Sequence, residues 1–165
     1  MFKRLILFLL IVVGGALLAA VAHSAPRGES GYAPGTIIVK TGERRLYYVT
    51  EDGRRISFPV GVGKKGWSWH GHATIEAKYI APAWQAPPEL WHRPGPPPVI
   101  AGGAPNNPMG VAALTMRNGE YAIHGTNNPG SVGGYVSHGC IRMYNADIKK
   151  LFSMVSVGTP VVVEQ

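Results

Sequence analysis

The residues of this chain best suited to chemistry surround its one cysteine, Cys140, which lies in the run Ser-His-Gly-Cys-Ile-Arg at 137–142. A histidine, His124, precedes the cysteine by sixteen positions. A thiol is a strong nucleophile only as the thiolate, and a neighbouring imidazole can accept its proton, so a Cys–His pair suffices for covalent acyl transfer. Gly139 allows a tight turn directly before the cysteine, where backbone N–H groups can face a developing oxyanion.

Two other uses of these residues compete with catalysis. A single cysteine is often a small buried hydrophobic residue without chemistry. His124, His138 and Cys140 are also acceptable zinc ligands, but neither a CxxC nor an HExxH spacing accompanies them. We therefore predict a catalytic cysteine, no metal and no cofactor.

The N-terminal segment is typical of a secretory signal. Lys3 and Arg4 form its charged start, an apolar run follows over residues 5–13, and Ala-Val-Ala at 20–22 has the small-x-small pattern of a cleavage site. We predict a signal peptide over residues 1–24, with an uncleaved N-terminal anchor as the alternative. The protein is thus expected in the periplasm or cell envelope, where a retained single thiol favours a functional use.

Length and charge bound the rest of the chain. Residues 25–35 are expected to be a short linker, and residues 36–165 one domain with a single core. The formal charge is +7, which suits an anionic wall or membrane surface. The basic residues are scattered, so no nucleic-acid binding is expected. The glycine-rich run at 61–66 lacks P-loop spacing and is predicted to be an ordinary loop.

Strand patterns dominate the domain, because β-branched and aromatic residues alternate with turn signals. One amphipathic helix is predicted from Asn145, taken as its N-cap, since four apolar residues follow at helical spacing. The fold class is therefore mostly β with one or two short helices. The predicted strands are residues 36–40, 45–50, 54–60, 73–81, 111–116, 121–124 and 161–163, and the apolar helix residues are Ile148, Leu151, Phe152 and Val155.

A proline-rich segment interrupts this pattern. Residues 82–108 hold nine of the fourteen prolines, so we predict no regular structure there but an ordered flap or substrate-facing loop. Its Trp84 and Trp91 either pin the loop by local packing or contact a sugar or peptide substrate. The run His-Gly-His at 70–72 is predicted to be a surface loop.

Four segments are distinctive in combination: Arg45–Tyr47, Asn107–Gly110, His124–Thr126 and Ser137–Met143. Together they resemble the YkuD-type L,D-transpeptidase catalytic domain, from about residue 36 to 163. The resemblance implies a β-sandwich-like fold with the active-site cysteine under a flap. It also implies peptidoglycan chemistry, in which the cysteine attacks the bond between an L-centre and D-Ala of a tetrapeptide stem, releases D-Ala and passes the acyl group to an amine.

The roles of the histidines come from this resemblance. The residues alone leave open which histidine is the base, since His138 is nearer to Cys140 in sequence, and nearness does not determine side-chain direction. The resemblance implies that Cys140 is the nucleophile, that His124 is its general base, and that the carbonyl of Gly125 orients the imidazole. It places His138 in the lining of the site, where it helps to stabilise the charge that forms.

Two further residues are predicted to bind substrate. Arg142 follows Cys140 by two positions, so in an extended segment both side chains share a face, and the guanidinium can hold a substrate carboxylate in bidentate fashion. The alternative is an arginine tied to Asp147 or to backbone carbonyls. Ser137 is placed in the same substrate-binding site.

One segment departs from the family pattern. The family commonly has Thr-Pro-x-Gly after the second hairpin, whereas residues 69–73 here are Trp-His-Gly-His-Ala. The resemblance therefore covers the nucleophile and the base but not substrate positioning by that loop.

Three functions remain open at this point. The first is a transpeptidase that cross-links stems or attaches a protein to them, and the second is a hydrolase on the same fold, an L,D-carboxypeptidase or an amidase. An acyl-enzyme is common to both, and its partition depends on acceptor access and water exclusion. The third, a non-catalytic wall-binding protein, is disfavoured by the intact Cys140 and His124. The predicted partners are peptidoglycan stem peptides and, for protein attachment, a wall-attached acceptor protein; the oligomeric state is not specified.

Overall fold

The structure is a computed structural model of the chain, and it describes residues 31–88, 91–117 and 119–165. The predicted signal peptide, residues 1–24, lies outside this part of the chain, as does the first half of the predicted linker. No helix within the described ranges is long and apolar enough to cross a membrane.

The first of two main sheets contains five strands in the order β3-β2-β1-β13-β5. The chain's first described strand, β1, pairs in parallel with the last, β13, through Ile37↔Val161 and the three following residue pairs. The other neighbours in this sheet are antiparallel. These strands are β1 (Ile37–Lys40), β2 (Arg45–Val49), β3 (Arg55–Pro59), β5 (Gly71–Thr74) and β13 (Pro160–Glu164).

The second sheet contains four strands in the order β12-β10-β9-β6. They are β6 (Ala77–Ile80), β9 (Ala112–Met116), β10 (Tyr121–His124) and β12 (Ile141–Arg142). The parallel pair β10–β12 aligns His124 with Arg142, so this sheet brings the two segments of interest side by side.

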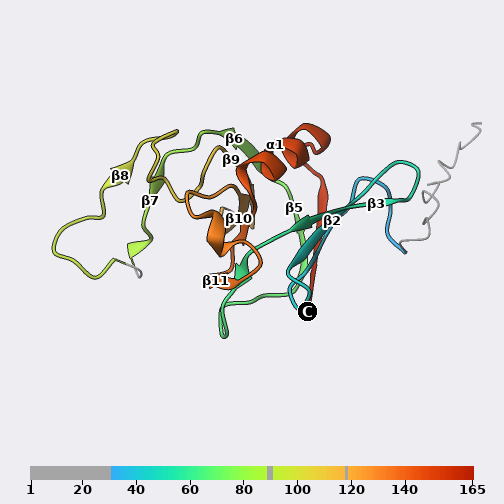
Figure 1. The fold of residues 1–165 in the computed structure, drawn as a ribbon, viewed down its shortest axis with the longest axis horizontal. Coiled ribbons are helices and arrows are strands. Elements are labelled where there is room, and N and C mark those ends of the chain that lie inside the picture. The colour runs from blue at the N-terminus through green and yellow to red at the C-terminus, as the bar shows by residue number, and fades with distance from the viewer. Residues whose placement is uncertain (1–30, 89–90, 118) are drawn as a thin grey trace, which may run out of the picture.

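Both sheets and one helix share a single hydrophobic core. The helix α1 (Asn145–Met154) packs against β9 and β10 and runs along the top of that sheet in Figure 1. Its Ile148 and Leu151 are fully buried, as the apolar spacing predicts, and truncating such a residue to alanine typically costs about 2–5 kcal/mol. The predicted mostly β, β-sandwich-like fold class is confirmed, with one α-helix in the described part of the chain.

The beginning of this helix differs from the prediction. The N-cap position is occupied by Tyr144, with no side-chain cap, and Asn145 is the first helical residue. The carboxamide oxygen of Asn145 instead accepts hydrogen bonds from the backbone N–H groups of Val111 and Thr126. The side-chain oxygen of Asn145 thus binds two N–H groups of neighbouring loops and not the N–H groups at the start of its own helix.

The predicted strand 73–81 is divided between the two sheets. Residues 71–74 pair with β13, which also corrects the surface-loop prediction for residues 71 and 72. Residues 77–80 pair with β9. Between them Ile75 is buried in the core and the N–H of Glu76 donates to the carbonyl of Thr115, so the chain crosses from one sheet to the other here.

The proline-rich segment also contains more order than predicted. Two short strands within it, β7 (Trp84–Gln85) and β8 (Val99–Ile100), pair as an antiparallel ribbon. None of these four residues is proline, so their N–H groups are available for pairing. Figure 1 shows this segment, here called the flap (residues 82–108), projecting at the end of the molecule opposite β2 and β3.

A last pair of strands leads into the cysteine run. The strand β11 (Tyr135–Ser137) pairs in parallel with β4 (Val62–Gly63), and a short 3-10 helix, Pro129–Ser131, precedes it. The chain then turns at residues 138–140 and enters β12. The turn between β11 and β12 therefore carries Cys140.

Candidate active site

His124 is the last residue of β10 and is only 4% exposed. Its backbone carbonyl accepts a hydrogen bond from the N–H of Met143, which ties the strand end to the segment after β12. Its Nδ1 lies 2.6 Å from the carbonyl oxygen of Gly125. Because a carbonyl oxygen only accepts, Nδ1 must carry the proton, and in the neutral ring Nε2 is then an acceptor. The predicted contact between Gly125 and this imidazole is present.

The surroundings of His124 favour the neutral ring. Burial lowers its pKa to about 4, and the positive charge of Arg142 acts in the same direction. The carbonyls of Gly125 and Pro108 oppose the shift only in part. At neutral pH the imidazole is therefore uncharged, with a basic nitrogen available for a proton.

The turn before Cys140 depends on glycine and serine. Gly139 has a φ of +117°, and a Cβ at this position would collide with the ring of Tyr121. The hydroxyl of Ser137 accepts from the N–H of Gly139 at 3.1 Å and donates to the carbonyl of Cys140 at 2.6 Å. Ser137 is buried, and these two bonds close the turn around the cysteine.

The thiol of Cys140 is held in its protonated form. Burial raises its pKa, while a hydrogen bond from the Ala122 backbone and the charge of Arg142 counteract this effect. Together with the lowered pKa of His124, this makes a neutral thiol and a neutral imidazole the stable pair, rather than a thiolate and an imidazolium. A thiol in this state needs a base to become a nucleophilic thiolate.

A cavity of about 240 Å³ is lined by five of the seven predicted site residues, whereas Gly125 and Gly139 do not line it. Cys140, His124, His138, Ser137 and Arg142 all line it. Other lining residues come from the flap and from neighbouring strands and loops: Trp67, Trp84, Pro87, Pro108, Met109, Glu120 and Tyr121.

The two flap tryptophans have different surroundings. Trp84 lines the cavity, where contact with a substrate remains a prediction. The indole N–H of Trp91 donates to the carbonyl of Gly95 at 2.8 Å, within the flap, as the packing reading predicts. The sequence could not separate these two cases, since both residues lie in the same proline-rich context.

His138 lies on the rim and is partly exposed. Its Nε2 is 2.9 Å from the ammonium of Lys64, and the ring of Trp67 meets it edge-on at 4.6 Å. An ammonium only donates, so Nε2 is the acceptor and the neutral ring carries its proton on Nδ1. Burial, Lys64 and Arg142 all lower the pKa of His138. Lys64 was not predicted as a site residue, because its partner His138 lies 74 positions away and its own loop lacks a recognisable motif.

Arg142 faces the cavity from β12. The salt bridges found among the described residues do not include it, so the alternative ion pair with Asp147 is not formed. Its Nε is buried without a hydrogen-bond partner. A buried guanidinium N–H without a partner is costly, and an anionic ligand in the cavity could satisfy it.

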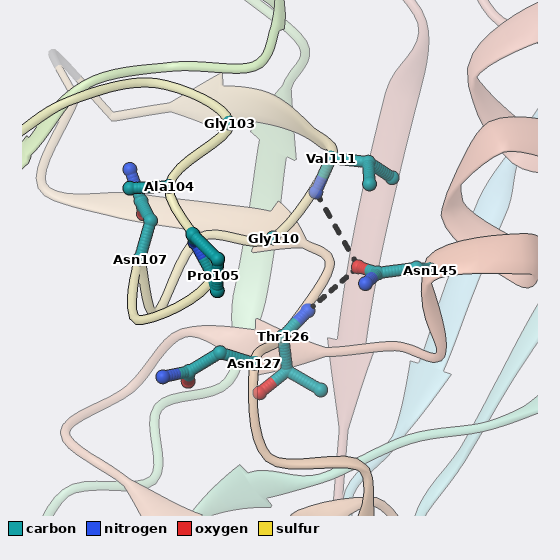
Figure 2. A pocket seen from close by; sticks show the side chains of 9 residues that line it. All are labelled: Gly103, Ala104, Pro105, Asn107, Gly110, Val111, Thr126, Asn127 and Asn145. Atoms are coloured by element: carbon teal, nitrogen blue, oxygen red, sulfur yellow. Dashed lines mark hydrogen bonds between the residues drawn. The ribbon is translucent and has the colours of Figure 1, made fainter.

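A second, smaller cavity of about 140 Å³, lined by Asn145 and by residues of the loops around Asn107 and Thr126, is shown in Figure 2. In this view the side-chain oxygen of Asn145 receives the N–H groups of Val111 at 3.3 Å and Thr126 at 3.0 Å. A Cβ at Gly110 or Gly125 would collide with the same oxygen. Asn145 thus holds the backbone next to the Gly125 carbonyl that orients His124, a role that sequence spacing could not reveal.

The zinc alternative is not supported by the arrangement. Within residues 31–88, 91–117 and 119–165, no group of three or more histidine, cysteine or acidic side chains is placed to hold a metal ion.

Solved structures share this architecture. L,D-transpeptidase 3 from Mycobacterium tuberculosis superposes with a TM-score of 0.64 at 16% identity, covering 79% of this chain and 60% of that one. The catalytic domain from the E. faecium L,D-transpeptidase gives 0.59 at 21% identity, covering 78% of this chain and 95% of that one. The fold is that of an L,D-transpeptidase catalytic domain.

Sequence comparisons agree with the fold. Residues 34–163 match YkuD, the L,D-transpeptidase catalytic domain, and this chain belongs to that family. The probable L,D-transpeptidase ErfK/SrfK of Escherichia coli K12 is 41% identical over 132 residues, which cover 76% of this chain and 42% of the relative. The putative L,D-transpeptidase YkuD of Bacillus subtilis 168 is 48% identical over 61 residues, covering 37% of each chain. This chain therefore matches only about two fifths of the length of such relatives.

Proposed function

We propose that this protein is an exported peptidoglycan L,D-transpeptidase that works through an acyl-enzyme on Cys140. The observation that carries the proposal is a buried, neutral His124 whose Nδ1 is bonded to the carbonyl of Gly125 and which lines the same cavity as the cysteine. The names of the relatives support the same reaction class.

In the first step, sulfur attacks the carbonyl that joins the L-centre of the third stem residue to D-Ala. His124 takes the thiol proton as the S–C bond forms, and a backbone N–H of the turn at Gly139 faces the oxyanion. The tetrahedral intermediate then collapses, the C–N bond breaks, and His124 returns the proton to the departing D-Ala amine. The product is a thioester on Cys140.

In the second step, an acceptor amine attacks the thioester. His124 removes a proton from the amine, and the thiolate of Cys140 leaves and is reprotonated. The acceptor is the amine of another stem or of a wall-attached protein. Water in the same place would give hydrolysis.

The other site residues support these steps. We assign Arg142 to a carboxylate of the stem peptide, because its side chain lines the cavity and its buried Nε has no hydrogen-bond partner. His138, as an Nδ1–H tautomer, helps to stabilise the negative charge. Ser137 was predicted to bind substrate, but its hydroxyl is engaged within the turn, so we assign it to holding Cys140 in place. No cofactor takes part.

The test is incubation of the full chain with purified muropeptides that carry tetrapeptide stems, followed by mass spectrometry. We expect release of D-Ala, a thioester adduct on the protein and new stem-to-stem or stem-to-amine products. Tripeptide products alone would instead make the protein an L,D-carboxypeptidase. Cys140→Ala should abolish turnover and leave the fold intact. Release of D-Ala by that variant would refute the assignment of Cys140 as the nucleophile. Activity should survive dialysis against a chelator.

A further inference from the structure

Trp69 lies in the segment that departs from the family's usual Thr-Pro-x-Gly, yet it contacts the cysteine turn directly. Its indole N–H donates to the carbonyl of Gly139 at 3.1 Å. Its ring stacks on Tyr121, with centroids 5.0 Å apart and planes 20° from parallel. A residue 70 positions upstream of this turn is therefore bonded to the peptide that precedes the sulfur.

The two stacked rings form a firm support. Both pack against the hydrophobic core, and the guanidinium of Arg117 lies over each ring, 5.3 Å from the centre of Trp69 and 5.8 Å from that of Tyr121. Tyr121 occupies the space where a Cβ of Gly139 would lie. Tyr121 and Trp69 therefore both contact the turn at Gly139.

The hydrogen bond from Trp69 to the Gly139 carbonyl also determines the direction of the neighbouring Cys140 N–H. The carbonyl of Gly139 and the N–H of Cys140 belong to one planar trans peptide, in which they point in opposite directions. Holding the carbonyl toward Trp69 therefore directs the N–H of Cys140 away from Trp69. The other N–H of the turn, that of Gly139, is already bonded to Ser137.

We propose that Trp69 is a positioning residue for acyl transfer: its indole N–H holds the Gly139–Cys140 peptide so that the N–H of Cys140 faces the oxyanion. The inference rests on the proposed function, because an oxyanion forms only when the thiol attacks a carbonyl. The indole touches no reacting atom, and it acts entirely through this peptide.

The decisive variant is Trp69→Phe, which keeps an aromatic ring on Tyr121 but removes the N–H donor. If it fails to fold, the same change is made with 3-benzothienylalanine at position 69, which replaces the indole N–H by sulfur and keeps the bicyclic shape. Trp91→Phe is the matched control, because Trp91 also donates its indole N–H to a glycine carbonyl, that of Gly95, but outside the cysteine turn.

Two reactions of Cys140 separate positioning from a general structural effect. Acylation by a carbapenem or by a tetrapeptide passes through an oxyanion, whereas alkylation by iodoacetamide is displacement at a saturated carbon and does not. We expect Trp69→Phe to slow acylation about tenfold or more, through kcat rather than KM, since removing one oxyanion donor outright costs roughly 100- to 1000-fold. Alkylation should stay at the parent rate, and Trp91→Phe should change neither reaction.

Three results would overturn the inference. Acylation of the Trp69→Phe chain at the parent rate would show that the indole bond does not orient the oxyanion donor. An equal fall in acylation and alkylation would show that Trp69 merely maintains the turn. A parent chain that neither reagent acylates would refute the proposed function, and this inference with it.

Discussion

The two histidines beside Cys140 occupy regions of contrasting structure. His124 belongs to the floor of the cavity, the paired strands β10 and β12, where it is buried and its ring is bonded to a backbone carbonyl. His138 belongs to the rim, the turn between β11 and β12, where it is partly exposed and meets the exposed Lys64. The strand position of His124 determines both the direction and the protonation of its ring, whereas the ring of His138 in the turn depends on an exposed surface partner.

The largest expected effect tests which region supplies the base. His124→Ala should slow alkylation of Cys140 near neutral pH about a hundredfold or more, because the thiol is protonated and attack needs a base. His138→Ala should slow it only slightly. The measurement is the rate of iodoacetamide labelling followed by mass spectrometry. Equal and small effects of both substitutions would end the assignment of His124.

The second prediction concerns the contribution of the buried His124 to the pH dependence of stability. The pKa of His124 is about 4 in the folded state and 6.5 when unperturbed. Between these pH values the unfolded chain binds a proton that the folded chain excludes. The contribution of neutral His124 to the free energy of unfolding is therefore fully present above pH 6.5 and is lost as the pH falls toward 4. The loss attributable to this group is on the order of 3 kcal/mol.

Urea unfolding at a series of pH values measures this loss. The neutral variant His124→Gln should show a flatter pH dependence across the same window. An unchanged slope in that variant would assign the acid sensitivity to other groups.

The third prediction asks whether the floor also recognises substrate. Arg142→Lys conserves charge but loses the planar fork that binds a carboxylate in bidentate fashion. It should lower kcat/KM on a purified tetrapeptide, while iodoacetamide labelling of Cys140 stays near the parent rate. Parent-level peptide activity with lysine would refute bidentate recognition, and a joint collapse of both rates would mean that Arg142 holds the loop in place.

The smallest effect is expected at the rim. Lys64→Met removes the ammonium that lowers the pKa of His138, so this pKa should rise toward its ordinary value. The shift is measured by NMR titration of the histidine ring, with the Cys140 labelling rate as a control that should not change. A pKa of His138 that does not move would show that Lys64 is not its partner in solution.

Much of the fold was predictable because strand and turn preferences act between near neighbours. The hairpins formed by β1, β2 and β3 follow the predicted ranges closely, and the helix buries Ile148 and Leu151, two of the four residues that its spacing selected. The predictions failed where contacts between residues distant in sequence determine the structure. Asn145 is not the N-cap, because its side chain accepts hydrogen bonds from backbone N–H groups 19 and 34 residues away. The predicted strand 73–81 was divided because its two halves found partners in different sheets.

The sequence by itself determined the family and the residue types of the site, since a single cysteine and two histidines that are each followed by glycine are recognisable from short runs. Only the tertiary structure decided the state of each group. It buried His124 between strands, brought Lys64 to His138 across 74 positions, and brought Trp69 to the cysteine turn. Burial and such contacts set the pKa and orientation of a side chain, and both depend on residues that are adjacent in space but not in sequence.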